Sequence, residues 1–139
     1  MENGYGKGTS VQALVVTPTR ELAIQIADNV KHYSANTGIS SAVIYGGVGQ
    51  NPQVKQLKRG VDILVATPGR LLDLHNQGYV NLKHLRHFVL DEADQMLDMG
   101  FIHDIKKLLR LIPERRQSLF FSATMPRSIV DLSKQMLGH

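Results

Sequence analysis

Five short apolar runs constrain the fold of this chain more than any other feature of its 139 residues. Each run is apolar almost throughout instead of alternating with polar residues, as expected of a strand covered by helices on both faces. Their starts lie roughly 20 to 30 residues apart, the length of a right-handed strand-helix-strand unit. We therefore predict an α/β fold with a mostly parallel sheet of about five strands flanked by helices. The predicted strands are residues 11–16, 41–46, 61–66, 86–90 and 118–122.

Apolar residues recur at helical spacing in two of the segments between these runs. The first pattern runs from Leu22 to Tyr33, and the second is closed by Pro113 and three charged residues. The apolar positions of the second pattern are Leu97, Phe101, Ile105, Leu108 and Ile112. Each pattern is predicted to be a helix, and Met96 and Met99 are expected to pack in the core.

The composition of the chain says more about the compartment of the protein than about its function. The chain has no cysteine, which excludes disulfides and thiolate metal sites and is typical of a reducing compartment. No stretch approaches the roughly 20 apolar residues of a membrane span, and the first residues lack the apolar segment of a signal peptide. We expect a cytoplasmic protein without membrane contact, with a flexible lead-in over residues 1–10 and one domain over residues 11–139. The net charge of +4 favours an anionic partner.

Polar or glycine-rich turns follow all five apolar runs. In an open parallel sheet the carboxyl ends of the strands share one edge, where such folds bind ligands. Any single turn of this kind is explained equally well by the preference of Thr, Gly, Asp and Ser for helix starts. The set of five favours a ligand site, and it consists of TPTR (17–20), GG (46–47), TPGR (67–70), DEAD (91–94) and SAT (122–124).

Two of these turns are near copies, LVVTPTREL (14–22) and LVATPGRLL (64–72). In each, a threonine can cap a helix, a proline suits its first position, and an arginine falls in its first turn. Because acids are preferred at a helix N-terminus, Arg20 and Arg70 make best sense beside a bound anion. The alternative is an intramolecular ion pair with a nearby acid. Two such clamps predict contacts to successive phosphates of one nucleic-acid strand, which fix position without reading sequence.

The segment FVLDEAD (88–94) places three acids directly after an apolar run, in the form of a Walker B segment. Asp91 would hold magnesium, usually through water, and Glu92 would orient or deprotonate the water that attacks a γ-phosphate. Asp94 is expected to point away from the metal, toward the hydroxyls of Ser122 and Thr124. That pairing would link two sites.

With these motifs in place, the chain resembles the first RecA-like domain of a DEAD-box ATP-dependent RNA helicase of bacterial type. PTRELA (18–23), GG, TPGR, DEAD and SAT occur in the family's order and spacing, and VLDEADQMLDMGF (89–101) extends the match. The resemblance covers residues 11–137 and implies a RecA-like three-layer sandwich.

The resemblance also implies roles for individual residues. Asp91 and Glu92 would be catalytic and would handle Mg²⁺, and ATP and Mg²⁺ would be the cofactors of the intact helicase. Asp94, Ser122 and Thr124 would couple the nucleotide state to strand separation. Contacts to the RNA sugar-phosphate backbone would come from Pro18, Thr19, Arg20, Gly47, Thr67, Pro68 and Arg70.

The family's Walker A loop, GxxxxGK[ST], has no counterpart in this sequence, and neither do its adenine-reading segment and second RecA-like domain. GYGKGTS (4–10) is a poor substitute, because Gly8 follows the lysine where Ser or Thr is needed. We therefore expect a partial first domain that binds neither ATP nor Mg²⁺ tightly and does not hydrolyse ATP alone. The resemblance places the absent Walker A strand beside residues 118–122, which predicts an exposed edge there and self-association through it.

Three functions remain open from sequence. The chain is part of an ATP-dependent RNA helicase, a stand-alone RNA-binding module without catalysis, or an interaction module that docks on intact helicases or on itself. ATP turnover would separate the first from the other two.

Overall fold

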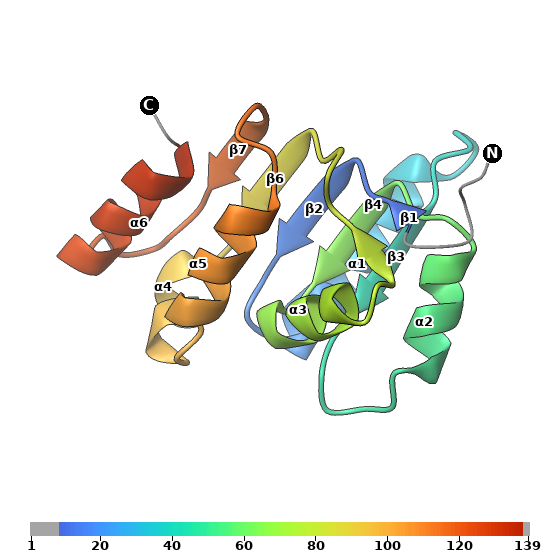
Figure 1. The fold of residues 1–139 in the computed structure, drawn as a ribbon, viewed down its shortest axis with the longest axis horizontal. Coiled ribbons are helices and arrows are strands. Elements are labelled where there is room, and N and C mark those ends of the chain that lie inside the picture. The colour runs from blue at the N-terminus through green and yellow to red at the C-terminus, as the bar shows by residue number, and fades with distance from the viewer. Residues whose placement is uncertain (1–8, 138–139) are drawn as a thin grey trace.

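The computed structural model describes residues 9–137 and contains a five-stranded sheet in which every neighbouring pair is parallel. The strand order is β3-β4-β2-β6-β7 (Figure 1). Each strand begins and ends within two residues of its predicted run, so the predicted sheet is confirmed. The strands are β2 (Ala13–Val16), β3 (Ser41–Ile44), β4 (Ile63–Ala66), β6 (His87–Leu90) and β7 (Gln117–Phe120).

Helices cover both faces of this sheet, as its continuous apolar strands require. In Figure 1, α3 and α5 lie on the near face and α1 lies on the far face. The helices are α1 (Arg20–Ser34), α2 (Asn51–Lys58), α3 (Pro68–Asn76), α4 (Ala93–Asp98), α5 (Ile102–Leu111) and α6 (Arg127–Leu137). No helix within residues 9–137 is long and apolar enough to cross a membrane.

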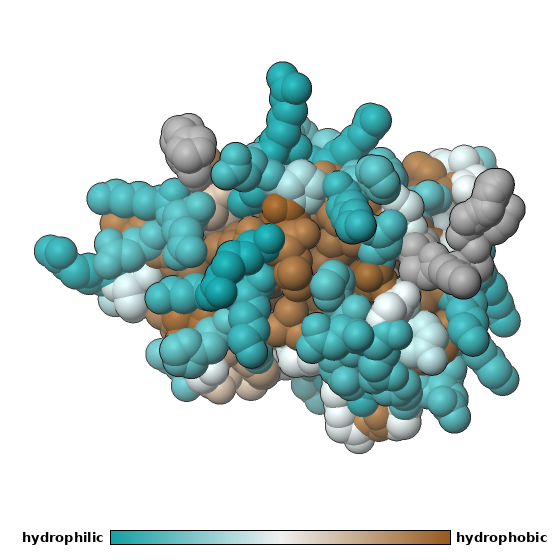
Figure 2. Space-filling model, viewed as in Figure 1, coloured by the Kyte–Doolittle hydropathy of each residue, from teal (hydrophilic) through white to brown (hydrophobic). Residues whose placement is uncertain are grey.

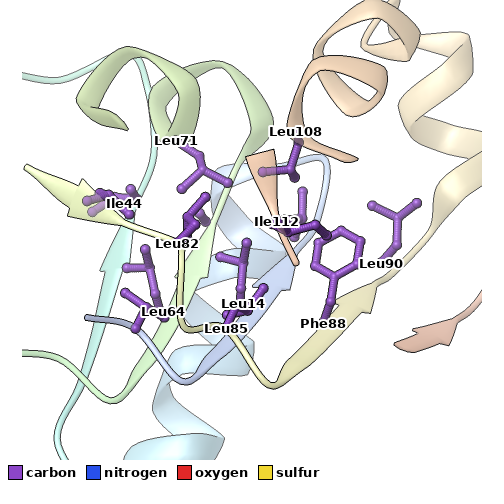
Figure 3. Close-up of a cluster of buried hydrophobic side chains, with 14 of the residues drawn as sticks. Leu14, Ile44, Leu64, Leu71, Leu82, Leu85, Phe88, Leu90, Leu108 and Ile112 are labelled. Atoms are coloured by element: carbon purple, nitrogen blue, oxygen red, sulfur yellow. The ribbon is translucent and has the colours of Figure 1, made fainter. Parts of the chain in front are cut away.

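The core lies between the sheet and the helices of the near face. Leu14 of β2 is in register with Leu64 of β4 and with Phe88 of β6, and all three side chains are fully buried. Side chains in register on parallel strands point to the same face, so these three form one row across the sheet. Leu71 of α3 and Leu108 of α5 belong to the same apolar cluster (Figure 3).

Hydrophilic side chains surround the middle of the face that carries α3 and α5. Figure 2 shows apolar side chains gathered in the centre of this face, with hydrophilic ones around them. The arrangement matches the amphipathic pattern of α5, which buries Ile105 and Leu108.

The pattern predicted as one helix from Leu97 to Ile112 is two helices, so that prediction is wrong. Gly100 adopts a φ of 87° after α4, its N–H donates to the carbonyl of Leu97, and the N–H of Phe101 donates to the carbonyl of Met96. These two bonds form a Schellman motif, which glycine permits because it has no Cβ. Met96 is buried as predicted, whereas Met99 at the end of α4 is 50% exposed.

A second, two-stranded parallel sheet has no counterpart in the predictions. In it β1 (Thr9–Ser10) pairs with β5 (Val80–Asn81). Thr9 and Ser10 belong to the stretch predicted as a flexible lead-in, and the remainder of that stretch lies outside the described residues. The lysine of GYGKGTS lies outside them as well.

Candidate functional site

The carboxyl edge of the sheet separates the predicted motifs by their charge. The strand order places GG after β3, TPGR after β4 and TPTR after β2, side by side. DEAD follows β6 and SAT follows β7, at the other end of the same edge. The order along the chain does not show this division. The edge therefore has an arginine half and a carboxylate half.

A hollow of about 580 Å³ marks the arginine half. Five residues predicted to contact RNA line it, namely Pro18, Thr19, Arg20, Thr67 and Arg70. Glu21 and Asp73 line it too, so its charge is mixed. Met99, Phe101 and the ring of Tyr45 add apolar surface.

Arg20 is exposed and makes no ion pair within the described residues. Its guanidinium carbon lies 5.2 Å from the centre of the Tyr45 ring, within the range of a cation-π interaction. This contact fixes the side chain without neutralising it. The alternative of an intramolecular ion pair is therefore wrong for Arg20.

Arg70 also has no acidic partner among residues 9–137. Its Nη1 donates to Oε1 of Gln53 at 3.1 Å, and its Nη2 donates to the carbonyl of Val48 at 2.7 Å. Both acceptors are neutral, so the guanidinium keeps its charge. Since Arg70 is only half-buried, its remaining N–H groups are accessible to an anion.

The two near-copied turns start their helices differently. Thr67 is the N-cap of α3 and Pro68 its first residue, as predicted, although the Thr67 side chain makes no capping bond. In the first copy the N-cap is Thr19, whose Oγ1 accepts from the N–H of Leu22 at 3.2 Å, so that α1 begins two positions later in the motif. The hydroxyl of Thr19 accounts for the shift, because glycine stands at the equivalent position 69 and cannot cap in this way.

Two predicted contacts do not line the hollow. Pro68 is buried at the start of α3, where its ring sets the helix geometry. Gly47 is exposed next to the lining residue Gly46 and has a φ of 83°, a conformation that glycine adopts readily.

On the carboxylate half, Asp91 lies immediately after β6, and its N–H donates to the carbonyl of Val16 at 2.9 Å. Burial raises the pKa of Asp91, and a hydrogen bond from the Glu92 backbone offsets part of that rise. A carboxylate that loses hydration in this way is stabilised by a nearby cation.

Glu92 adopts a left-handed conformation, with a φ of 56° and a ψ of 52°, and is the N-cap of α4. Residues other than glycine rarely adopt this backbone conformation, and the strain that it causes is most common at functional sites. The turn places two successive acidic residues, Asp91 and Glu92, at the end of one strand.

Asp94 binds the loop that follows β7. Its Oδ2 accepts from Oγ1 of Thr124 at 2.8 Å and from the N–H of Thr124 at 3.0 Å. The N–H of Asp94 donates to Oγ of Ser122, which in turn donates to the carbonyl of Thr124. The hydrogen bond from the Thr124 side chain is the largest cause of the lowered pKa of Asp94. The predicted contact of the Asp94 carboxylate with the Thr124 hydroxyl is therefore present, whereas the Ser122 hydroxyl bonds the backbone N–H of Asp94.

The residues of this half fit an octahedral magnesium ion that keeps most of its waters. Mg²⁺ is usually held by one or two carboxylates together with substrate phosphates. Asp91 and Glu92 supply two half-buried carboxylates, and no group of three or more His, Cys, Asp or Glu residues that could hold a metal occurs within the described part of the chain. The donor set thus suits a water-mediated cation and does not form a closed protein cage.

The family model described as DEAD/DEAH box helicase matches residues 3–132 of this sequence. The chain belongs to the DEAD/DEAH box helicase family. A probable ATP-dependent RNA helicase of Methanocaldococcus jannaschii is 48% identical over 132 residues, which are 95% of this chain and 36% of that protein. The RNA helicase CrhR of Synechocystis is 48% identical over 128 residues, 92% of this chain and 26% of that protein.

A solved structure of the same fold supports the assignment. The crystal structure of a DEAD box protein from the hyperthermophile Methanococcus jannaschii superimposes with a TM-score of 0.87 at 48% identity, covering 94% of this chain and 36% of that one. The fold is therefore the RecA-like α/β fold of a DEAD-box helicase. This family member spans about a third of the length of these M. jannaschii proteins. A bacterial type stays a prediction.

Sequence reasoning missed Tyr45, Val48 and Gln53, which contact the two arginines. Tyr45 directly precedes the GG motif, and this position next to a predicted RNA contact is the one feature of the sequence that could have pointed to it. Gln53 lies in a helix whose pattern predicts nothing about arginine contacts.

Proposed function

We propose that this chain supplies the RNA-binding surface and the metal-binding carboxylates of an ATP-dependent RNA helicase. The observation that carries the proposal is the divided edge of the sheet, with Arg20 and Arg70 on one half and Asp91 and Glu92 on the other. One rigid sheet would thus hold RNA phosphates and nucleotide phosphates at a fixed separation. Residues 11–139 would form a partial first RecA-like domain.

RNA would be bound through its backbone. Arg20 and Arg70 supply charge, Thr19 and Thr67 supply hydroxyls beside them, and helix N-termini supply free N–H groups. Pro18 lines the hollow, Gly47 would contribute backbone only, and Pro68 would act by starting α3. Because none of these groups reads a base edge, binding would tolerate any sequence.

Hydrolysis would use the carboxylate half. Bound Mg²⁺ supplies positive charge that neutralises phosphate oxygens during phosphoryl transfer. Asp91 would hold that ion through water, and Glu92 would orient or deprotonate the attacking water. Asp94 would carry a change at these carboxylates to Ser122 and Thr124, through the hydrogen bonds described above.

Alone, the chain would not turn over ATP or bind it tightly with Mg²⁺. A lysine followed by Ser or Thr after glycine, which a phosphate-cradling loop requires, occurs nowhere in the 139 residues. A second candidate function, an RNA-binding module without catalysis, is favoured by the arginine hollow, which this chain builds by itself. A second RecA-like domain would be the partner in the helicase, and a cytoplasmic location remains our expectation.

Two measurements test the proposal. Single-stranded RNA of about 15 nucleotides should bind weakly and with equal affinity as oligouridine and oligoadenine, and Arg20→Ala or Arg70→Ala should weaken it about three- to tenfold. Phosphate release from ATP should stay at background for wild type and Glu92→Gln alike. RNA binding that both alanine variants leave unchanged would exclude the arginine hollow as the RNA site.

A second copy of this chain is the partner that we propose for the open edge of β7. This strand ends the sheet, Leu119 on it is 57% exposed, and Phe121 directly after it is 52% exposed. An apolar edge strand with free backbone groups is a template for pairing with an equivalent strand.

A further inference from the structure

Gln53 is a buried polar side chain behind the arginine hollow, with only 5% of its surface exposed. Its Oε1 accepts from the N–H of Tyr45 at 3.2 Å, and its Nε2 donates to the carbonyl of Tyr45 at 3.1 Å. The same Oε1 accepts from Nη1 of Arg70 at 3.1 Å. A single amide thus joins α2, the end of β3 and α3.

The contact with Arg70 fixes the direction of a guanidinium. Gln53 holds Nη1 and the Val48 carbonyl holds Nη2, so the planar group is anchored at two corners. Arginine has five N–H donors in a rigid fork, and orienting the fork decides which of them face a ligand. The unused donors are therefore presented in one orientation before any anion arrives.

The contacts with Tyr45 extend the same support to the second arginine. Gln53 bonds both the N–H and the carbonyl of Tyr45, and the Tyr45 ring lies 5.2 Å from the guanidinium carbon of Arg20. Tyr45 also directly precedes Gly46, which lines the hollow. The backbone that carries the ring is held by the amide that holds Arg70.

We propose that Gln53 is a positioning residue for RNA binding, which preorganises Arg70 directly and Arg20 through Tyr45. The inference rests on the proposed RNA function of the arginine hollow. Gln53 does not contact RNA. It restricts the Arg70 side chain before RNA binds, so that less conformational entropy is lost on binding.

A double-mutant cycle on the full chain tests the inference. Single-stranded oligouridine is titrated into wild type, Gln53→Leu, Arg70→Ala and the double variant. Gln53→Leu should weaken binding about two- to tenfold in wild type, the range of one or two lost hydrogen bonds, and by a smaller factor in the Arg70→Ala background, where only the support of Arg20 through Tyr45 remains to be lost. Gln56→Leu on the same helix, which has no side-chain partner within residues 9–137, should leave the affinity unchanged.

A second variant covers the case in which Gln53→Leu does not fold, since it leaves the Tyr45 backbone groups without partners. Gln53→Glu has the same shape, keeps the acceptor for the Tyr45 N–H and places a carboxylate against Arg70, so only the hydrogen bond to the Tyr45 carbonyl is lost. It should keep the circular dichroism of wild type, weaken RNA binding about as much as Arg70→Ala, and lower the salt slope by roughly one phosphate contact.

The outcomes separate the inference from the function on which it rests. An unchanged affinity in Arg70→Ala would overturn the proposed RNA site itself. A loss in Arg70→Ala combined with additive effects of Gln53→Leu, or with full affinity of a folded Gln53→Glu, would overturn the positioning role alone.

Discussion

Glu92 and Asn36 are the two residues other than glycine, within residues 9–137, that have a positive φ. A left-handed conformation costs an ordinary residue about 1–2 kcal/mol, because its Cβ approaches the following carbonyl. The fold tolerates this strain at Glu92, where the turn after β6 delivers the carboxylate proposed as general base.

Replacing Glu92 by glycine should therefore stabilise the protein. The relief of strain exceeds the extra chain entropy of glycine, so the free energy of unfolding should rise by about 0.5–1 kcal/mol. Urea denaturation measures the change, with Glu92→Gln as the control that keeps the strain and should match wild type. A Glu92→Gly variant less stable than Glu92→Gln would contradict the strain at this turn.

The raised pKa of Asp91 predicts that this residue makes the protein less stable as pH rises, whereas an acid with a hydrogen-bonded or charged partner makes it more stable. Burial raises its folded-state pKa, so the folded state holds its proton longer and stability falls as pH rises from the unfolded pKa through the folded pKa. Asp91→Asn removes this loss. It should be more stable than wild type at pH 7, and the two proteins should converge below about pH 3, where the acid is neutral in both states. An equal difference at both pH values would refute the assignment.

Residue types predicted the chemistry of the edge, but they did not predict what holds it in place. Arg20 and Arg70 stood out because arginine is unfavourable at a helix N-terminus. Gln53 and Tyr45 carry no such mismatch, and only the packing of α2 against the end of β3 and the start of α3 brings them to the arginines. Contacts made across strands leave no local signal in the chain.

At the scale of elements, Asp94 ties the start of α4 to the loop after β7. The lowered pKa of this carboxyl means that it stabilises the fold above its unfolded pKa, and that this contribution is lost as pH falls through the folded pKa. Thr124→Val removes the hydroxyl with little change of shape. It should lower the free energy of unfolding at pH 7 and lower it less at pH 3, as measured by thermal or urea unfolding. A cost that does not change with pH would show that the hydroxyl does not act on the charged carboxylate.

The edge strand β7 makes a second prediction at this scale. Leu119→Lys places a charge on the exposed strand and should abolish a concentration-dependent rise in mass measured by light scattering. Leu111→Lys, on the exposed end of α5, is the matched control and should still associate. A wild-type chain that remains monomeric over a wide concentration range would refute self-association.

Elements with strong patterns were predictable, and those without were not. The five apolar runs predicted the five strands of the large sheet, and β7 was expected at an edge, where it lies. The break between α4 and α5 depends on Gly100, which ends α4 although the helical spacing of the apolar residues continues across it. The strands β1 and β5 are two residues each, too short to show a period.

For the whole molecule, the strand order brings together motifs that are spread over 108 positions, from residue 17 to residue 124. They form two adjacent groups at one edge of the sheet, the arginine half and the carboxylate half. The boundary between them falls between two neighbouring strands, the central strand β2, which Arg20 follows, and β6, which Asp91 follows. An RNA strand and a metal-bound nucleotide would therefore occupy opposite halves of one edge.

The salt dependence of RNA binding tests this division most directly. Single-strand affinity should fall linearly with the logarithm of salt concentration, by a slope of roughly 0.7 for each phosphate contacted. Arg20→Ala and Arg70→Ala should each reduce the slope by about one contact, and the double variant by about two, whereas Lys134→Ala, on the exposed side of α6, should leave it unchanged. A slope that the double variant shares with wild type would contradict the account, because RNA would then bind elsewhere.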